Sequence, residues 1–205
     1  MTLLFIRHGE TALNAARVMQ PADTPLSARG LAQARAVGQR LASLQPVAVL
    51  SSDLPRALQT AQAIVDACGG LPLQTSDTLH ERNFGDLRGR PHASLGFDPL
   101  AMAEAPPGGE SIPDFEARCD RALDLALRLR ASLGGPLVVV SHGLVIKSLL
   151  QRRFALPAGA TVPDRVGNTS VTRVSHHLPL TADLVDCTVH LHGRIAEDGS
   201  SLSGG

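Results

Sequence analysis

Three short apolar runs end in residues that carry chemistry, and this arrangement constrains the fold more than any other feature. Residues 3–6, 47–50 and 137–140 have the continuous apolar character of strands buried in a parallel sheet. Polar residues come directly after each run: Arg7-His8-Gly9, Ser51-Ser52-Asp53 and Ser141-His142-Gly143. Because ligands of open α/β sheets bind beyond the carboxyl ends of strands, we expect these groups to meet at one edge of the sheet.

Helical patterns alternate with these strands from Thr2 to Phe154. This alternation predicts an α/β fold, a three-layer sandwich with a mostly parallel central sheet and helices on both faces. Four helices are expected, with caps at Ser27, Asp53 and Ser111 for the first three and residues 144–154 for the last. Further strands are expected near 71–76, 170–174 and 184–191. We expect a single domain over 1–192 and a flexible, glycine-rich tail over 193–205.

The polar strand ends contain the groups that a phosphate site needs. Arg7 follows the first strand, and Arg56 falls in the first turn of the helix after the second. Guanidinium groups hold phosphate oxygens in pairs, and helix amino termini add backbone donors. His8 and His142 add two imidazoles at the same edge. A surface Arg-His pair would explain the first run alone, but not its recurrence.

The chain resembles the histidine phosphatase superfamily in its phosphoglycerate-mutase-like branch, and in particular its small broad-specificity phosphatases. The resemblance rests on several sequence blocks in the family's order. They are Arg7-His8-Gly9-Glu10-Thr11 with Asn14, Asp23 to Gly30, Ser51 to Ala57 with Thr60-Ala61, Leu79 to Gly85, Pro106 to Ser111, and Val140 to Gly143. The resemblance implies the same three-layer fold and a phosphohistidine mechanism.

The resemblance also implies roles for individual residues. His8 is expected to be the nucleophile, since a neutral imidazole can attack phosphorus. Glu81 is expected to be the general acid that protonates the leaving oxygen and then activates water. Arg7, Arg56 and His142 are expected to complete the catalytic set by holding the phosphoryl oxygens. Residues expected to bind the substrate are Asn14, Thr11, Gln20 and Gly143.

Several alternatives remain open on the residues alone. His8 could serve only to hold phosphate, His142 could be a buried structural histidine, and Asn14 could cap a helix. Glu10 and Glu110 are rivals of Glu81, with local structural roles near their own loops as the competing interpretation. His80 and His92 are further candidates for lining the pocket. His190 and His192 have the two-residue spacing of metal ligands, but without a third ligand nearby they fit the solvated face of a strand.

Composition excludes other classes of function. Lys+Arg and Asp+Glu both number 19, so no polyanion partner such as nucleic acid is indicated. The absence of Trp and Tyr removes the stacking platforms of single-strand binders. Cys68, Cys119 and Cys187 are odd in number and widely spaced; we expect Cys68 and Cys119 to be buried thiols. No leader or membrane-length apolar run is visible, which predicts a cytoplasmic protein without membrane partners.

We expect a phosphatase that hydrolyses phosphate monoesters of small metabolites without a metal or other cofactor. A Gly-x-Ser-x-Gly elbow and a Walker loop are both missing from the sequence. A phosphoglycerate mutase, a protein phosphatase and a non-catalytic binder of phosphorylated ligands are the alternatives. Many small phosphatases of the family carry Trp at Leu87 and an acid at Arg88, so the substrate stays open. Against a mutase, residues 90–109 offer only Arg90 and His92 to hold a second anion. The closing apolar strand would also allow a homodimer.

Overall fold

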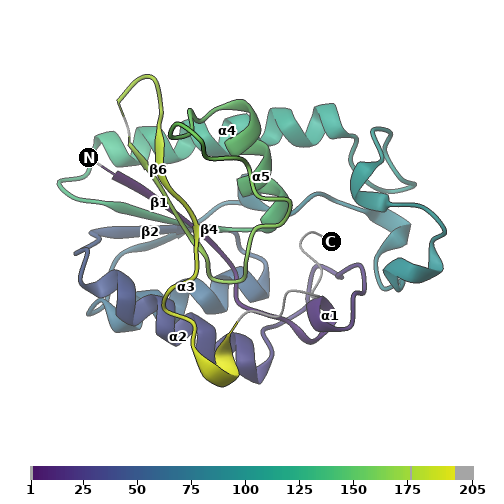
Figure 1. Ribbon diagram of the computed structural model, residues 1–205, viewed down its shortest axis with the longest axis horizontal. Coiled ribbons are helices and arrows are strands. Elements are labelled where there is room, and N and C mark those ends of the chain that lie inside the picture. Colours follow the sequence, from purple (N-terminus) through teal and green to yellow (C-terminus); the bar gives the residue numbers. More distant parts are fainter. Residues whose placement is uncertain (1, 176, 197–205) are drawn as a thin grey trace.

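A six-stranded sheet forms the centre of the protein, for which a computed structural model describes residues 2–175 and 177–196 (Figure 1). In spatial order the strands are β3 (Leu73–Thr75), β2 (Ala48–Ser51), β4 (Leu137–Ser141), β1 (Thr2–Arg7), β5 (Val171–Ser175) and β6 (Ala182–Cys187). The first four run parallel, whereas β5 and β6 pair antiparallel. The predicted mostly parallel sheet is therefore confirmed.

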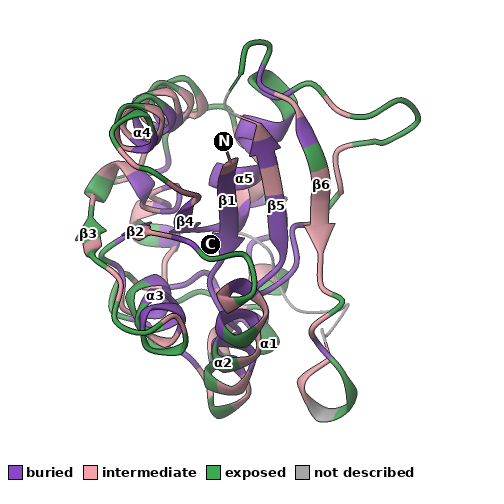
Figure 2. Cartoon of the chain, turned by 90° about the vertical axis from the view of Figure 1, so that its left-hand side faces the viewer, coloured by how far each residue is buried: buried purple, intermediate pink, exposed green. Residues whose placement is uncertain are grey.

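Helices cover both faces of this sheet, which confirms the α/β three-layer sandwich. The helices are α1 (Ala12–Ala15), α2 (Ala28–Ala42), α3 (Pro55–Ala67), α4 (Ile112–Ala131) and α5 (Gly143–Arg152). Figure 1 shows α4 above the sheet and α2 and α3 below it. One core cluster joins the sheet to α4 and α5, and a second joins it to α2 and α3. Since both faces are covered, the inner strands are buried almost completely (Figure 2).

Two of the three predicted helix caps are present. The Ser27 hydroxyl accepts a hydrogen bond from the amide of Gly30 (3.0 Å), and the Ser111 hydroxyl accepts one from the amide of Asp114 (3.2 Å). The prediction of Asp53 as the cap of α3 is wrong. The Asp53 carboxylate pairs instead with the His80 ring, and the amide at the start of α3 bonds to the Ser52 hydroxyl (3.3 Å).

The segment between β3 and α4 contains only short 3-10 turns, in agreement with its lack of periodicity. These turns are Asp77–Leu79, Gly85–Leu87, His92–Ser94 and Pro99–Ala101. A small apolar cluster anchors the segment, with Met19, Phe84, Leu87 and Leu95 buried together. Met19 also exchanges backbone hydrogen bonds with Arg90 (3.0 Å) and Gly89 (2.7 Å). The segment thereby lies beyond the carboxyl edge of the sheet, on the right in Figure 1.

The last strand is shorter than predicted. It spans Ala182–Cys187 rather than 184–191, because Asp186 adopts a left-handed φ of 50° and the pairing with β5 shifts register. His190 consequently does not lie on a solvated strand face. Its ring is half-buried and contacts the Arg40 guanidinium and the Thr169 hydroxyl, both at 3.1 Å. β6 is an edge strand, and its pairing with a second copy stays a prediction.

Three other predictions concern the C-terminal tail, the cysteines and membrane-spanning helices. Of the predicted tail, residues 193–195 form a 3-10 turn and residues 197–205 lie outside the described part of the chain. Cys119 is buried as expected, but Cys68 at the end of α3 is only partly buried. Within the described residues, no helix combines the length and the apolar character needed to cross a membrane.

Candidate active site

The parallel pairing of β1, β4 and β2 brings the predicted polar groups together. Arg7 lies opposite Ser141 in the register of β1 and β4, and β2 pairs with the other side of β4. The amide of His8 donates to the carbonyl of Ser141 (3.0 Å). The rings of His8 and His142 lie beyond this pair, with centroids 5.1 Å apart. The sequence prediction that these strand ends meet at one edge is confirmed.

The environment of His8 selects one tautomer of its ring. Nδ1 lies 2.7 Å from the carbonyl oxygen of Gly9, and because a carbonyl can only accept, Nδ1 carries the proton. Nε2 is therefore left with the lone pair. Burial, reinforced by the positive charges of Arg7 and Arg56, lowers the pKa of His8 well below its ordinary value. The ring is thus neutral at physiological pH, as a nucleophilic imidazole must be.

A distant loop holds the backbone of His8 in place. The side-chain amide of Asn168 donates to the carbonyl of His8 (3.0 Å), and the amide of Thr169 donates to the carbonyl of Arg7 (3.0 Å). Thr169 adopts a left-handed φ of 53°, a conformation that such residues rarely take. The sequence analysis missed these residues. Nothing local in the sequence signals a contact between such distant positions.

Arg56 is a buried cation without a carboxylate bound to it among the described residues. It is 2% exposed, and its Nη1 reaches only the carbonyls of Pro21 and Ala22, each at 3.4 Å. Its Nε has no hydrogen-bond partner in the described part of the chain. Burial lowers the pKa of Arg56 to about 10, an effect that the charge of Glu81 partly opposes. A buried guanidinium in this state is stabilised by a bound anion.

Arg7 lies on the same edge and is fully buried at the end of β1. Its Nη1 donates to the carbonyl of Val166 (2.6 Å), which fixes the direction of the guanidinium. The charges of Arg7 and Arg56 both act on His8, His142 and Glu81. The site therefore concentrates positive potential around two imidazoles and one carboxyl group.

His142 occupies the N-cap of α5, where the first amides of the helix favour an anion. Its Nε2 lies 2.9 Å from the Ser52 hydroxyl, and no residue in 2–175 or 177–196 bonds to its buried Nδ1. Burial, followed by the charges of Arg56 and His8, lowers the pKa of His142 well below its ordinary value. The ring is neutral in the free protein, and a bound phosphate dianion would raise its pKa again.

Glu81 is buried, with both carboxylate oxygens fixed by backbone amides. Oε1 accepts from the amide of Arg82 (3.0 Å), and Oε2 accepts from the amide of Leu144 in α5 (3.1 Å). Burial raises the pKa of Glu81 above its ordinary value, and these two hydrogen bonds oppose the shift. Glu81 lines a cleft of about 560 Å³ together with residues of the 77–118 region. This geometry fits a general acid.

The two rival acids are both engaged in structural contacts. Glu10 accepts from the Ser27 hydroxyl (2.9 Å) and pairs with Arg29 (3.2 Å), which joins the loop after β1 to α2. Glu110 pairs with Arg118, the closer contact being 2.7 Å. Both acids fit the local structural interpretation that the sequence left open.

The predicted substrate-binding residues after β1 form an interlocked, buried turn. The Thr11 hydroxyl accepts from the amide of Asn14 (2.9 Å), the Asn14 side chain accepts from the amide of Thr11 (3.2 Å), and the same hydroxyl donates to Gln20 (2.7 Å). Asn14 thus belongs to the capping box of α1. Gly143 is the first residue of α5. Contact of these four residues with substrate stays a prediction.

Gly9 does provide a close approach, but to another part of the chain. A Cβ on Gly9 would lie 2.6 Å from the carbonyl oxygen of Gly30, and one on Gly30 would come still closer to the carbonyl oxygen of Glu10. At these two positions the loop after β1 packs on the first turn of α2. The two glycines therefore fix the catalytic loop against a helix.

Of the two histidines considered for the pocket, only His80 lines the cleft of Glu81. His80 pairs with Asp53, while His92 lies near Asp98, with 3.4 Å between Nε2 and Oδ1. Within the described residues, no group of three or more His, Cys, Asp or Glu side chains is placed to hold a metal ion.

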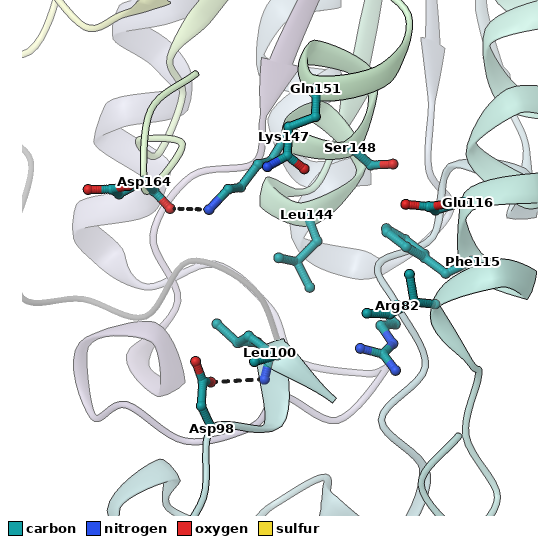
Figure 3. A pocket seen from close by; sticks show the side chains of 12 residues that line it. Arg82, Asp98, Leu100, Phe115, Glu116, Leu144, Lys147, Ser148, Gln151 and Asp164 are labelled. Carbon is teal, nitrogen blue, oxygen red and sulfur yellow. Dashed lines mark hydrogen bonds between the residues drawn. The ribbon is translucent and has the colours of Figure 1, made fainter. Parts of the chain in front are cut away.

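A second cavity, of about 390 Å³, lies between the 77–118 region and α5 (Figure 3). Its lining includes the side chains of Arg82 and Leu144, the two residues whose amides bind Glu81. Lys147 at its edge donates to the carbonyl of Asp164 (2.7 Å). Neither His8 nor Glu81 lines this cavity.

Known proteins resemble this chain over most of its length. The model of the histidine phosphatase superfamily (branch 1) matches residues 3–178. A probable phosphoglycerate mutase GpmB of Yersinia pestis (strain Pestoides F) is 38% identical over 186 residues, covering 86% of this chain and 85% of that protein.

Two solved phosphatase structures are also similar. The mycobacterial glucosyl-3-phosphoglycerate phosphatase in complex with VO3 matches with a TM-score of 0.74 and 30% identity, covering 89% of this chain and 97% of that one. A putative alpha-ribazole-5'-P phosphatase of Escherichia coli str. K-12 matches with a TM-score of 0.77 and 30% identity, covering 92% and 97%.

Proposed function

The chain belongs to the histidine phosphatase superfamily, and from that premise we propose that it hydrolyses phosphate monoesters of small metabolites through a phosphohistidine on His8. The observation that carries the proposal is the tautomer of His8. Its Nδ1 is bound to the carbonyl of Gly9, which leaves the Nε2 lone pair for attack, and the ring centroid lies 5.1 Å from that of His142.

In the first step, Nε2 of His8 attacks phosphorus and the bond from phosphorus to the ester oxygen breaks. Arg7, Arg56 and His142 bind the phosphoryl oxygens as charge builds in the flat transition state. Glu81 in its protonated form, which burial favours by raising its pKa, gives its proton to the leaving alkoxide. The products are the alcohol and a phosphohistidine.

In the second step, water attacks the phosphohistidine. The Glu81 carboxylate now takes a proton from that water, and the bond from Nε2 to phosphorus breaks. Inorganic phosphate leaves, His8 is again neutral, and Glu81 is again protonated. No step uses a metal ion or a further cofactor.

The test is the covalent intermediate on His8. Replacement His8→Ala should lower kcat by several orders of magnitude while the far-UV circular dichroism spectrum stays that of the folded protein. With the unmodified protein, rapid quenching in alkali followed by mass spectrometry should find one added phosphoryl group on His8. Unchanged turnover in His8→Ala, or a phosphoryl group on another residue, would contradict the mechanism.

Phosphoryl transfer is the second candidate, since a probable phosphoglycerate mutase is among the relatives. A mutase must retain a bisphosphate near its phosphohistidine. In residues 90–109 the expected cations are Arg90, which is exposed, and His92, which faces Asp98. This favours hydrolysis. A long-lived phosphohistidine together with efficient conversion of 3-phosphoglycerate to 2-phosphoglycerate would favour the mutase.

A further inference from the structure

The hydroxyl of Thr60 lies against the backbone that follows the nucleophile. Thr60 belongs to the second turn of α3, one turn after Arg56, and its side chain is fully buried. Its Oγ1 accepts a hydrogen bond from the amide of Gly9 (3.0 Å), although the two residues are 51 positions apart. In the described part of the chain, the buried Gly9 amide bonds to no other acceptor. Thr60 therefore satisfies a donor of the catalytic loop that would otherwise be unpaired.

A second hydrogen bond fixes the direction of this hydroxyl. Oγ1 of Thr60 donates to the carbonyl of Arg56 (2.7 Å), a bond that threonine in a helix often makes to the preceding turn. Because a hydroxyl has a single proton, this bond uses it and leaves a lone pair for Gly9. One side chain thus links the loop of the nucleophile to the turn that carries Arg56.

Both hydrogen-bonding groups of Gly9 act on the geometry of His8. Its amide is bound by Thr60, and its carbonyl accepts from Nδ1 of His8 (2.7 Å), which is the contact that selects the tautomer. Glycine has the widest choice of backbone angles, so a hydrogen bond at each end of the residue restricts it. The peptide group between His8 and Gly9 is also held from its other side, where Asn168 donates to the carbonyl of His8 (3.0 Å). The position of the Gly9 carbonyl therefore depends on Thr60.

We propose that Thr60 is a positioning residue for the nucleophile, holding Gly9 where its carbonyl keeps the His8 ring in the tautomer with a free Nε2 lone pair. The inference rests on the proposed function for the role of His8 as nucleophile. Thr60 does not touch the reacting atoms, and its effect is transmitted through the backbone of Gly9.

Two substitutions separate this role from packing, the other task of a buried threonine. Thr60→Val keeps the shape of the side chain but removes the hydroxyl, so the Gly9 amide loses its acceptor. Thr60→Ser keeps the hydroxyl and loses one methyl group. A positioning role predicts that the valine variant is defective and the serine variant is active, whereas a packing role predicts the reverse.

The first measurement separates turnover from phosphate binding. With nitrophenyl phosphate, Thr60→Val should lower kcat by about 10- to 100-fold, the range of one buried amide left without an acceptor. Thr60→Ser should keep most of the kcat of the unmodified protein. Titration calorimetry with inorganic phosphate should give a similar Kd for all three proteins, because Arg7, Arg56 and His142 are unchanged.

The second measurement reads the His8 ring directly. In protein labelled with nitrogen-15 histidine, long-range proton–nitrogen spectra should show His8 protonated at Nδ1, and His8→Ala identifies its signals. Thr60→Val should show the other tautomer as well, and part of its phosphohistidine should form on Nδ1 instead of Nε2. A loss of stability alone would not change which ring nitrogen carries the proton.

Thr172→Val is the matched control. Thr172 is also buried, and its Oγ1 accepts from the amide of Asp186 (3.1 Å), so the same exchange removes the same kind of bond away from Gly9. It should keep both kcat and the His8 spectrum. A control that changed both as much as Thr60→Val would overturn the proposal, and so would a serine variant as defective as the valine variant.

The outcome for Thr60 is distinguishable from that of the proposed function. Full turnover in His8→Ala would remove the nucleophile, while the ring spectra would still decide whether Thr60 sets the tautomer. An unchanged His8 spectrum in Thr60→Val would overturn the positioning role, with the phosphohistidine mechanism left intact. If Thr60→Val does not fold, Thr60→Ala removes the hydroxyl without placing a methyl group against the Gly9 amide, and the same spectra decide.

Discussion

Replacement Glu81→Gln separates the two proton transfers of the proposed reaction from binding. The amide cannot protonate a leaving alkoxide or activate water, so kcat on alkyl phosphates should fall by about 10²- to 10⁴-fold. That loss corresponds to roughly 3 to 5 kcal/mol of barrier. Nitrophenyl phosphate has a leaving group that needs no proton, so its first step should be slowed less.

The structure also predicts a stability effect of this substitution. Both carboxylate oxygens of Glu81 accept backbone amides, from Arg82 (3.0 Å) and Leu144 (3.1 Å). The amide nitrogen of Gln is a donor, so one of these two buried amides loses its acceptor, at a cost of about 1–3 kcal/mol. For a domain of this size we expect Tm to fall by about 2–4 °C for each kcal/mol.

The assay is a rapid-mixing experiment with nitrophenyl phosphate. Glu81→Gln should release close to one nitrophenolate per chain in a burst, followed by slow turnover, because the phosphohistidine forms but is not hydrolysed. Mass spectrometry after an alkaline quench should then find the adduct on His8. Glu110→Gln is the matched control, since it lines the same cleft but is bound by Arg118; it should show no burst. Wild-type turnover of alkyl phosphates by folded Glu81→Gln would refute the assignment.

Two further predictions concern metal ions and pH. Activity should survive strong chelators and be inhibited by vanadate, which imitates the five-coordinate transition state; loss of turnover with a chelator and its return with a divalent metal would contradict the mechanism. Burial lowers the pKa of His8 and raises that of Glu81, and the reaction needs the first neutral and the second protonated, so kcat/KM should fall as pH rises through the raised pKa of Glu81. In Glu81→Gln this high-pH decline should be absent from the pH profile; its persistence there would assign the decline to another group.

The strands and helices could be predicted from the sequence where one physical cause dominated. Buried parallel strands must be apolar throughout, so residues 3–6, 47–50 and 137–140 were found, and the serine caps at Ser27 and Ser111 mark helix starts by a local hydrogen bond. The predictions of a cap at Asp53 and of the end of β6 were wrong because features that the local pattern does not show decided both. His80 binds the Asp53 carboxylate from 27 positions away, and a left-handed Asp186 ends the alternation that the sequence continues.

The same distinction applies to the residues of the candidate site. His8, Arg7 and His142 lie at or directly after strand ends, and the order of parallel strands places them together without further information. Asn168 could not be found in that way, because the loop that carries it has no periodicity and its contact with His8 joins distant parts of the chain.

The separation between residues placed by the sheet and residues placed by loops bears on the substrate specificity of the protein. Arg7, His8 and His142 are positioned by the ends of β1 and β4, where a change of one side chain disturbs buried neighbours. The cleft that contains Glu81 is lined mainly by the 77–118 region, with Ala22 and Leu54. The small cluster around Met19 and Phe84 anchors part of that region outside the sheet. We therefore expect substitutions of cleft residues other than Glu81 to alter which ester is bound without disturbing His8. The ratio of kcat/KM for two different phosphate esters should then change while the phosphohistidine still forms.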